Sequence, residues 1–269
     1  MKHIDPGEGA PPSLLDRPDG ETLAFHHLPG ATPGILFCTG FHSNMNGEKA
    51  LALEAFCRET GRQMTRFDYY GHGESSGDIQ HGTIGRWRED TLTILEQVTL
   101  GPQIIVGSSM GGWMMLLAAL ARPERVAALV GIAIAPDLTQ DLEERRLNVE
   151  QKTALAEQGW CDLANAYDDQ QPYRIRREML DEARRHTVLD GEIPIDAPVR
   201  LLHGLADEDV PWQRSLAAAQ RLRSKDAELI LIKDGDHRLS TPRDLARLTT
   251  VVTQLLEDSS EDLSLSHKL

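Results

Sequence analysis

This chain of 269 residues lacks several features, and each absence excludes a class of protein. Its cysteines are too few and too scattered for a disulfide framework or a cysteine-based zinc site: Cys38, Cys57 and Cys161. No apolar run approaches the roughly 20 residues that span a bilayer, so no transmembrane segment is expected. The start, "MKHIDPGEGAPPS", has neither the apolar core of a secretory signal nor the arginines of a mitochondrial transit peptide. Together these absences predict a protein of the reducing cytoplasm.

Positive charge is also scarce. Lysine and arginine number 28 against 42 acidic residues, and the net charge is −14. Neutralising phosphate groups requires a basic surface, so binding to nucleic acid or to anionic membranes is not expected. No spacing of histidine, cysteine and acidic residues suggests a metal site, and none suggests an organic cofactor. The composition, 40% apolar and 26% charged, is typical of a soluble globular protein; it leaves the oligomeric state open.

Short apolar runs alternate with helical patterns along the chain and predict an α/β fold. The helical patterns include 47–61 and 83–98. Because most of the apolar runs are continuous and do not alternate with polar residues, they indicate strands buried on both faces of a mostly parallel sheet flanked by helices. The runs are 34–40, 64–70, 103–108, 126–135, 199–204 and 227–234.

One interval departs from this alternation of strands and helices. Residues 136–198 separate two predicted strands by far more than a crossover needs, and they are polar and helix-prone. We interpret them as a helical cap over the carboxyl ends of the strands, with a peripheral insertion as the alternative. The expected organisation is an N-terminal extension (1–20), one domain (21–257) that includes the cap, and a flexible acidic tail (258–269).

The chain twice matches G-x-S-x-G, the turn that carries the nucleophilic serine of α/β-hydrolases. The matches are "GSSMG" around Ser109 and "GESSG" around Ser75. That turn needs a strand before the serine and a helix after it. Ser109 has both, since "QIIV" precedes it and "MGGWMMLLAALA" follows it. Ser75 stands in a glycine-rich stretch without a following helix, so we predict Ser109 as the nucleophile.

A serine hydroxyl needs an imidazole to take its proton and a carboxylate to orient that imidazole. Asp207 and His237 follow Ser109 in the order used by α/β-hydrolases, and each stands just after a predicted strand. We predict these three residues as the catalytic triad. Three other acids stay open as the partner of the histidine: Asp137, Glu208 and Asp209.

The negative charge that develops on the substrate must be met by two backbone N–H groups. One is expected from Met110, the residue after the nucleophile. The other is expected from the loop after the strand 34–40, at Phe41. Many hydrolases have His-Gly at this point, where this chain has Thr39-Gly40.

The blocks "RFDYYGHGESSGD", "GSSMGGW", "LLHGLADEDVPW" and "DHR" resemble one family of serine hydrolases. This is the family of the palmitoyl-protein thioesterase also described as mycophenolic acid acyl-glucuronide esterase, or α/β-hydrolase domain-containing protein ten. The similarity runs from about Pro33 to near Leu255. It implies the α/β-hydrolase fold with a cap after its sixth strand, and nucleophile, acid and base at Ser109, Asp207 and His237. It also implies cleavage of S-palmitoyl groups from proteins and of acyl-glucuronide esters.

The leading hypothesis is therefore a hydrolase of thioesters or esters, acting on a small molecule or an S-acylated protein. A short-chain carboxylesterase and an acyltransferase are the alternatives within the enzymes. A small-molecule receptor that keeps the fold is the alternative outside them. The arginines of the cap could attract an acidic substrate, although a solvated helix face is the simpler interpretation: Arg174, Arg176, Arg177, Arg184 and Arg185.

Overall fold

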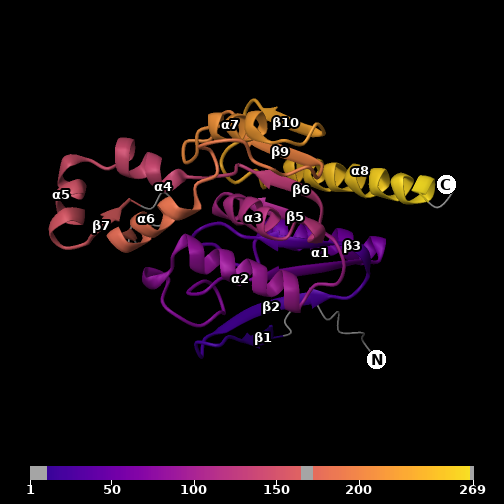
Figure 1. The fold of residues 1–269 in the computed structure, drawn as a ribbon, viewed down its shortest axis with the longest axis horizontal. Helices are drawn as coiled ribbons and strands as arrows, with labels where there is room; N and C mark the ends of the chain where they lie inside the picture. Colours follow the sequence, from indigo (N-terminus) through magenta and orange to yellow (C-terminus); the bar gives the residue numbers. More distant parts are fainter. Residues whose placement is uncertain (1–10, 165–171, 267–269) are drawn as a thin grey trace.

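Eight strands form one sheet in the computed structural model, which describes residues 11–164 and 172–266 (Figure 1). Six neighbouring strands run parallel, and the two strands at one edge are joined to them and to each other by antiparallel pairing, as expected for a mostly parallel sheet. Listed across the sheet, the strands are β1 (Ser13–Asp16), β2 (Thr22–Leu28), β4 (Arg62–Phe67), β3 (Ala31–Cys38), β5 (Gln103–Ser108), β6 (Val126–Ile132), β9 (Val199–Gly204) and β10 (Ala227–Ile232).

The parallel strands coincide with the six apolar runs of the sequence, to within a few residues at their ends. The antiparallel pair β1 and β2 was not predicted, and β1 lies inside the segment 1–20 that was expected to be an extension. Both strands lie at the edge of the sheet, where exposed and half-buried positions interrupt the apolar pattern. A strand of this kind gives a weaker sequence signal than one buried on both faces.

Helices cover both faces of the sheet and divide the core in two. Helices α1 (Glu48–Thr60) and α8 (Pro242–Ser266) pack on one face. Helices α2 (Ile84–Gln97), α3 (Met110–Ala121) and α7 (Gln213–Arg221) pack on the other. Successive side chains of β3 point to alternate cores, since Ile35 and Phe37 face α1 whereas Leu36 and Cys38 face α3. The continuous apolar runs therefore reflect strands buried on both faces.

The interval between β6 and β9 forms a separate lobe at the left of Figure 1. It contains helical segments, as predicted, and also a two-stranded antiparallel hairpin that was not predicted. The hairpin strands are only four residues long, too short to show an alternating pattern. The elements of the lobe are α4 (Leu138–Asp141), a π-helical turn (Leu142–Arg146), α5 (Val149–Glu157), β7 (Trp160–Leu163), β8 (Tyr173–Arg176), α6 (Arg177–Ala183) and a 3₁₀ turn (Arg184–His186).

The last helix is longer than expected. Helix α8 continues to Ser266, through most of the segment 258–269 that was predicted as a flexible tail. No glycine or proline follows Pro242, so nothing in the sequence ends the helix at the domain boundary. Despite its 25 residues, α8 carries too many charged groups to cross a bilayer, and no other helix among the described residues is both long and apolar enough to do so.

Candidate active site

Ser109 occupies a strained turn between β5 and α3. Its backbone is at φ 55° and ψ −120°, a conformation that costs a non-glycine residue about 1–3 kcal/mol. Main-chain hydrogen bonds hold it there. The Ser109 N–H donates to the carbonyl oxygen of Ile132 (2.9 Å), and the Ser109 carbonyl accepts from Ala135 (3.0 Å). The end of β6 therefore fixes the turn.

The glycines around Ser109 allow this turn to pack closely. A Cβ atom at Gly107 would lie 2.4 Å from the carbonyl oxygen of Gly111. A Cβ at Gly111 would lie 2.0 Å from the carbonyl oxygen of Cys38, at the end of β3. Neither distance is possible for a real side chain. The glycine spacing in the motif thus brings the start of α3 directly against the strand ends.

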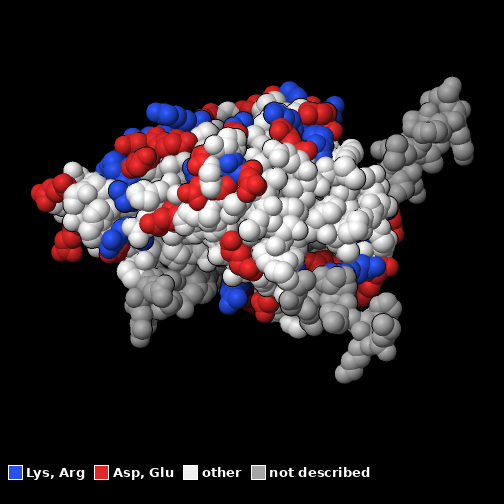
Figure 2. Space-filling model, turned by 90° about the horizontal axis from the view of Figure 1, so that it is seen from below, with Lys and Arg blue, Asp and Glu red and all other residues white. Residues whose placement is uncertain are grey.

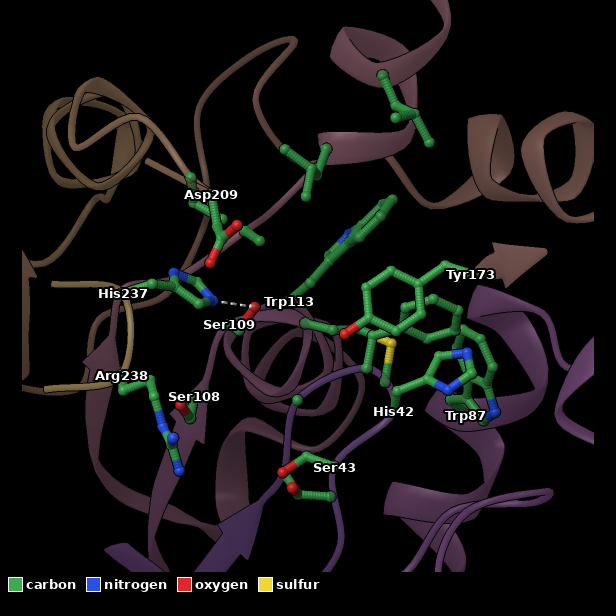
Figure 3. A pocket seen from close by; sticks show the side chains of 18 of the residues that line it. His42, Ser43, Trp87, Ser108, Ser109, Trp113, Tyr173, Asp209, His237 and Arg238 are labelled. Carbon is green, nitrogen blue, oxygen red and sulfur yellow. Dashed lines mark hydrogen bonds between the residues drawn. The ribbon is translucent and has the colours of Figure 1, made fainter. Parts of the chain in front are cut away.

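The three residues of the predicted triad lie in one hydrogen-bonded row, of which Figure 3 shows the bond between Ser109 and His237. The hydroxyl of Ser109 lies 3.0 Å from Nε2 of His237, and Nδ1 of His237 lies 2.8 Å from Oδ2 of Asp207. Asp207 stands in the loop after β9 and His237 in the loop after β10, on the same edge of the sheet as Ser109. This geometry allows the imidazole to accept the serine proton at Nε2 while the carboxylate holds Nδ1–H.

Asp207 is surrounded by donors. Its Oδ1 accepts the main-chain N–H groups of Asp209 (2.9 Å) and Val210 (2.8 Å), and its Oδ2 accepts His203 Nε2–H (3.0 Å) as well as His237. Burial alone would raise the pKa of Asp207, but the bonds from His203 and His237 outweigh it and hold that pKa well below its usual range. The carboxylate is therefore ionised and fixed in orientation.

The other acids lie in different surroundings. Asp137 accepts the N–H groups of Val188 (3.0 Å) and Leu189 (2.7 Å), where the chain returns from the cap, and among the described residues it forms no hydrogen bond with His237. Glu208 is exposed. Asp209 lines the cavity, and its carboxylate faces His237 in Figure 3.

One group of side chains could supply three ligands to a metal ion among the described residues. The ligand atoms of Asp207, Asp209 and His237 all lie within 4.8 Å of one another. Both ring nitrogens of His237 already take part in hydrogen bonds to Ser109 and Asp207. A metal ion would therefore have to displace the row described above.

The predicted oxyanion donors lie beside the serine. A Cβ on Gly40 would stand 3.4 Å from Cβ of Ser109, so the loop after β3 passes directly over the nucleophile turn. Phe41 and Met110 both line the cavity next to Ser109. Among the described residues, neither main-chain N–H donates a hydrogen bond to the protein. Both donors are thus available to a bound oxygen atom.

The cavity above Ser109 has a volume of about 820 Å³, within the range typical of small-molecule sites. The sheet side contributes the polar groups and the cap contributes mostly apolar side chains. Thr139, Arg146 and Gln151 are exceptions on the cap side. The principal apolar lining residues are Phe41, Ile84, Trp87, Trp113, Leu138, Leu142, Leu163, Ile175 and Met179, together with Tyr173.

Several residues around the site were not predicted from the sequence. His72 is buried, and its Nε2 accepts the N–H of His42 (3.3 Å) in the loop after β3. Tyr173 reaches the cavity from β8. The "LLHG" block contains His203, whose place just before Asp207 is the only sequence signal for any of them.

The arginines of the cap lie mostly in ion pairs, at the end of the molecule where blue and red side chains are mixed in Figure 2. Arg174 pairs with Asp162 across the hairpin and stacks on Trp160. Arg177 and Arg184 both bond Glu143. These contacts agree with the simpler interpretation, in which the arginines form a solvated face of the cap.

Family models and known proteins match this chain over most of its length. The family model described as "alpha/beta hydrolase fold" matches residues 33–154, and the model of the prolyl oligopeptidase family matches residues 97–260. The chain is 46% identical to the protein of Mus musculus named palmitoyl-protein thioesterase ABHD10, mitochondrial, over 92% of this chain and 83% of that protein. It is 43% identical to the Homo sapiens protein of the same name, over 92% and 81%.

Solved structures agree. The structure of mouse α/β-hydrolase domain-containing protein 10 matches with a TM-score of 0.86 and 46% identity, over 93% of this chain and 99% of that one. A putative hydrolase from Agrobacterium vitis S4 matches with a TM-score of 0.85 and 35% identity, over 90% and 96%. These matches confirm the predicted fold and the predicted family resemblance.

One expectation is wrong. The curated relatives are named as mitochondrial, which points to mitochondria and contradicts the predicted cytoplasmic location. The prediction rested largely on cysteine usage, which separates reducing from oxidising compartments but does not separate one reducing compartment from another. On its fold and its 43–46% identity over most of its length, this chain is a hydrolase and belongs to the ABHD10 family of α/β-hydrolases.

Proposed function

We propose that this chain is a serine hydrolase that removes long acyl groups from thioesters, S-palmitoyl groups on protein cysteines in particular, and also cleaves acyl esters. The proposal rests mainly on one observation, the hydrogen-bonded row from Ser109 through His237 to Asp207 at the floor of an apolar cavity. Family membership supports the substrate class, since the relatives are named palmitoyl-protein thioesterases.

The chemistry follows the geometry of that row. Ser109 Oγ attacks the acyl carbonyl carbon while its proton passes to Nε2 of His237, and the carbonyl electron pair moves onto oxygen. The N–H groups of Phe41 and Met110 stabilise that oxygen. His237 then gives the proton to the leaving sulfur or oxygen, which departs and leaves an acyl-enzyme. Water, activated by the same imidazole, releases the acid and restores the serine.

Asp207 has two tasks in this scheme. Its Oδ2 fixes the imidazole with Nδ1 protonated, which leaves Nε2 free to accept the serine proton. Its negative charge also stabilises the imidazolium that forms in the transition state. The donors around the carboxylate keep it ionised and immobile, so the imidazole is oriented before substrate arrives.

We propose that the segment 136–198 acts as the cap over this site and holds the acyl chain. Its apolar side chains face the cavity opposite Ser109, and a hydrocarbon chain in contact with them is removed from water. Asp137 holds the end of this segment, because its carboxylate accepts the N–H groups of Val188 and Leu189. A preference for long acyl chains is the expected consequence.

A series of matched substrates tests the proposal. We expect kcat/KM to rise with chain length when thioesters and oxygen esters with acyl chains of two to sixteen carbons are compared, and we expect Ser109→Ala to lose both turnover and labelling by a fluorophosphonate. A preference for the shortest chains would contradict the depalmitoylase and favour a general carboxylesterase. Transfer of the acyl group to an added alcohol or amine, seen by product analysis, would identify an acyltransferase instead. A single burst of product without turnover would favour a receptor that keeps the fold.

A further inference from the structure

Tyr173 is a cap residue that brings a polar group into the cavity of the proposed reaction centre and has no role in the scheme above. It begins β8, opposite Leu163 in the cap hairpin, and lines the same cavity as Ser109 and Met110. Its two parts, ring and hydroxyl, contact different surroundings. Each part can therefore be tested with a different substitution.

The ring packs on the loop that carries the proposed oxyanion donor. Its centroid lies 4.5 Å from that of His42 and 5.7 Å from that of Phe41. These spacings are typical of aromatic pairs in direct contact. His42 has a left-handed backbone (φ 54°), and its N–H donates to Nε2 of the buried His72. The loop is thus in contact with both a buried histidine and the tyrosine of the cap.

The hydroxyl points into the cavity. Figure 3 shows it directed from the cap toward Ser109, on the side of the serine away from His237. Phe41 and Met110, the proposed oxyanion donors, line the same cavity. No described residue accepts a hydrogen bond from this hydroxyl or donates one to it, so it is available to a ligand. Burial and the nearby charge of Asp209 raise the pKa of Tyr173, which keeps the phenol protonated as a donor at neutral pH.

We propose that Tyr173 is a further catalytic residue, supplied by the cap, whose hydroxyl donates a hydrogen bond to the substrate carbonyl oxygen as negative charge develops on it. No proton is transferred in this contact. The bond to Ser109 Oγ still forms as the carbonyl electron pair moves to oxygen, and His237 still carries the only proton that changes place. The ring keeps Phe41 in position, so the cap contributes to the oxyanion site as well as to the acyl pocket.

The inference rests on the proposed function, because it assigns a role at the same serine. Tyr173→Phe tests the hydroxyl alone, since the ring and its contacts stay. We expect kcat on a long-chain thioester and on the matched oxygen ester to fall about 100- to 1,000-fold, with KM within about twofold, as for the loss of one donor to an oxyanion. A kcat within twofold of the wild type would overturn the proposal. So would a rise in KM at unchanged kcat, because that pattern belongs to ground-state binding.

Tyr173→Leu tests the ring. Because it also removes the contacts with Phe41 and His42, we expect a further loss of kcat and slower labelling of Ser109 by the fluorophosphonate than in Tyr173→Phe. Equal rates for the two variants would overturn the role assigned to the ring. Tyr70→Phe is the matched control, as its side chain lies outside the cavity and stacks on Arg86; its kcat should equal that of the wild type.

Ser109→Ala distinguishes a failure of the proposed serine mechanism from a failure of the role assigned to Tyr173. If this variant kept its turnover, the serine mechanism itself would be wrong and no result at Tyr173 could be interpreted through it. If turnover depends on Ser109 and Tyr173→Phe is unimpaired, only the role of the tyrosine fails. Thermal melting of each variant shows whether a change in rate reflects unfolding, because a phenylalanine in the same place should leave the melting temperature unchanged.

Discussion

Two loops of this molecule share the pattern G-x-S-x-G but differ in the backbone conformation and the hydrogen bonds of their serine. The loop 107–111 joins β5 to α3 and holds Ser109 in a left-handed conformation with its hydroxyl toward His237. The loop 73–77 follows β4 and holds Ser75 against the edge of the sheet. The comparison separates a serine that is available for chemistry from one that is used for stability.

Both hydrogen-bonding capacities of the Ser75 hydroxyl are used within the protein. It donates to the carbonyl oxygen of Asp68 (2.6 Å) and accepts the N–H of Ala24 (2.8 Å) in β2. The Asp68 carboxylate in turn accepts the N–H groups of Met45 (2.7 Å) and Glu74 (2.9 Å). Ser75 thus connects β2 to the end of β4. No histidine among residues 11–164 and 172–266 forms a hydrogen bond with its hydroxyl, so none of them is placed to take its proton.

Ser109 has the opposite arrangement. Its backbone is bonded at both ends, whereas within the described part of the chain the only hydrogen-bond partner of its hydroxyl is an imidazole that is itself oriented by Asp207. The local strain is maintained by the main-chain bonds to the end of β6, and not by the serine side chain. A nucleophile held by its backbone can change its side-chain bonding during a reaction without unfolding the turn.

The largest expected effect is on the rate. Ser109→Ala removes the proposed nucleophile and should lower kcat by a factor of about 10³ or more, as when a residue of a catalytic triad is deleted. Its stability should stay within about 1 kcal/mol of the wild type, because the backbone bonds remain. Steady-state kinetics and urea unfolding on the same preparation measure both. A large loss of stability in Ser109→Ala would contradict the contrast with Ser75, because the Ser109 hydroxyl would then stabilise the fold as well.

Sequence reasoning located the first loop well. A buried strand, glycines on both sides of Ser109 and a following helix are local signals, and Asp207 and His237 could be placed because strands of a parallel sheet end at the same edge. The letters alone could not separate Asp207 from Asp137. The two acids are separated by a contact at the end of the cap, where the chain returns to the sheet. There the Asp137 carboxylate accepts the N–H groups of Val188 and Leu189.

The cap and the loop 73–77 were less predictable for a physical reason. Tyr173 stands on a four-residue strand without a pattern, and its neighbours Phe41 and His42 lie about 130 residues earlier in the chain. His72 is explained by its contact with His42, which the sequence does not show. Contacts between distant segments decide these roles, whereas the triad loops are decided largely by their own strands.

The second-largest expected effect is on the free energy of unfolding at low pH. It comes from His72, which stands just before the loop 73–77. Burial lowers the pKa of His72 from its ordinary value near 6.5 to about 4. Between these values the unfolded chain binds a proton that the folded chain does not, so the free energy of unfolding falls as the pH drops from about 6.5 to about 4. The full loss from this residue is about 3 kcal/mol.

His72→Gln removes this titration. We expect its free energy of unfolding, measured by urea denaturation between pH 7 and pH 4, to fall less steeply with acid than that of the wild type. The pKa values of His26, His27 and His42 are also lowered by burial, so part of the acid sensitivity should remain. Parallel curves for the two proteins would show that His72 does not titrate in this range.

The smallest effect belongs to Ser75. Ser75→Ala leaves the carbonyl of Asp68 and the N–H of Ala24 without their partner, which should lower the free energy of unfolding by about 1–2 kcal/mol. Labelling of Ser109 and kcat should be unchanged. Ser13→Ala, at an exposed serine on the neighbouring strand β1, is the control and should shift stability by less than about 0.5 kcal/mol. A loss of turnover in Ser75→Ala without a loss of stability would mean that the loop 73–77 takes part in the chemistry, and that the hydroxyl bonds described above are not its principal role.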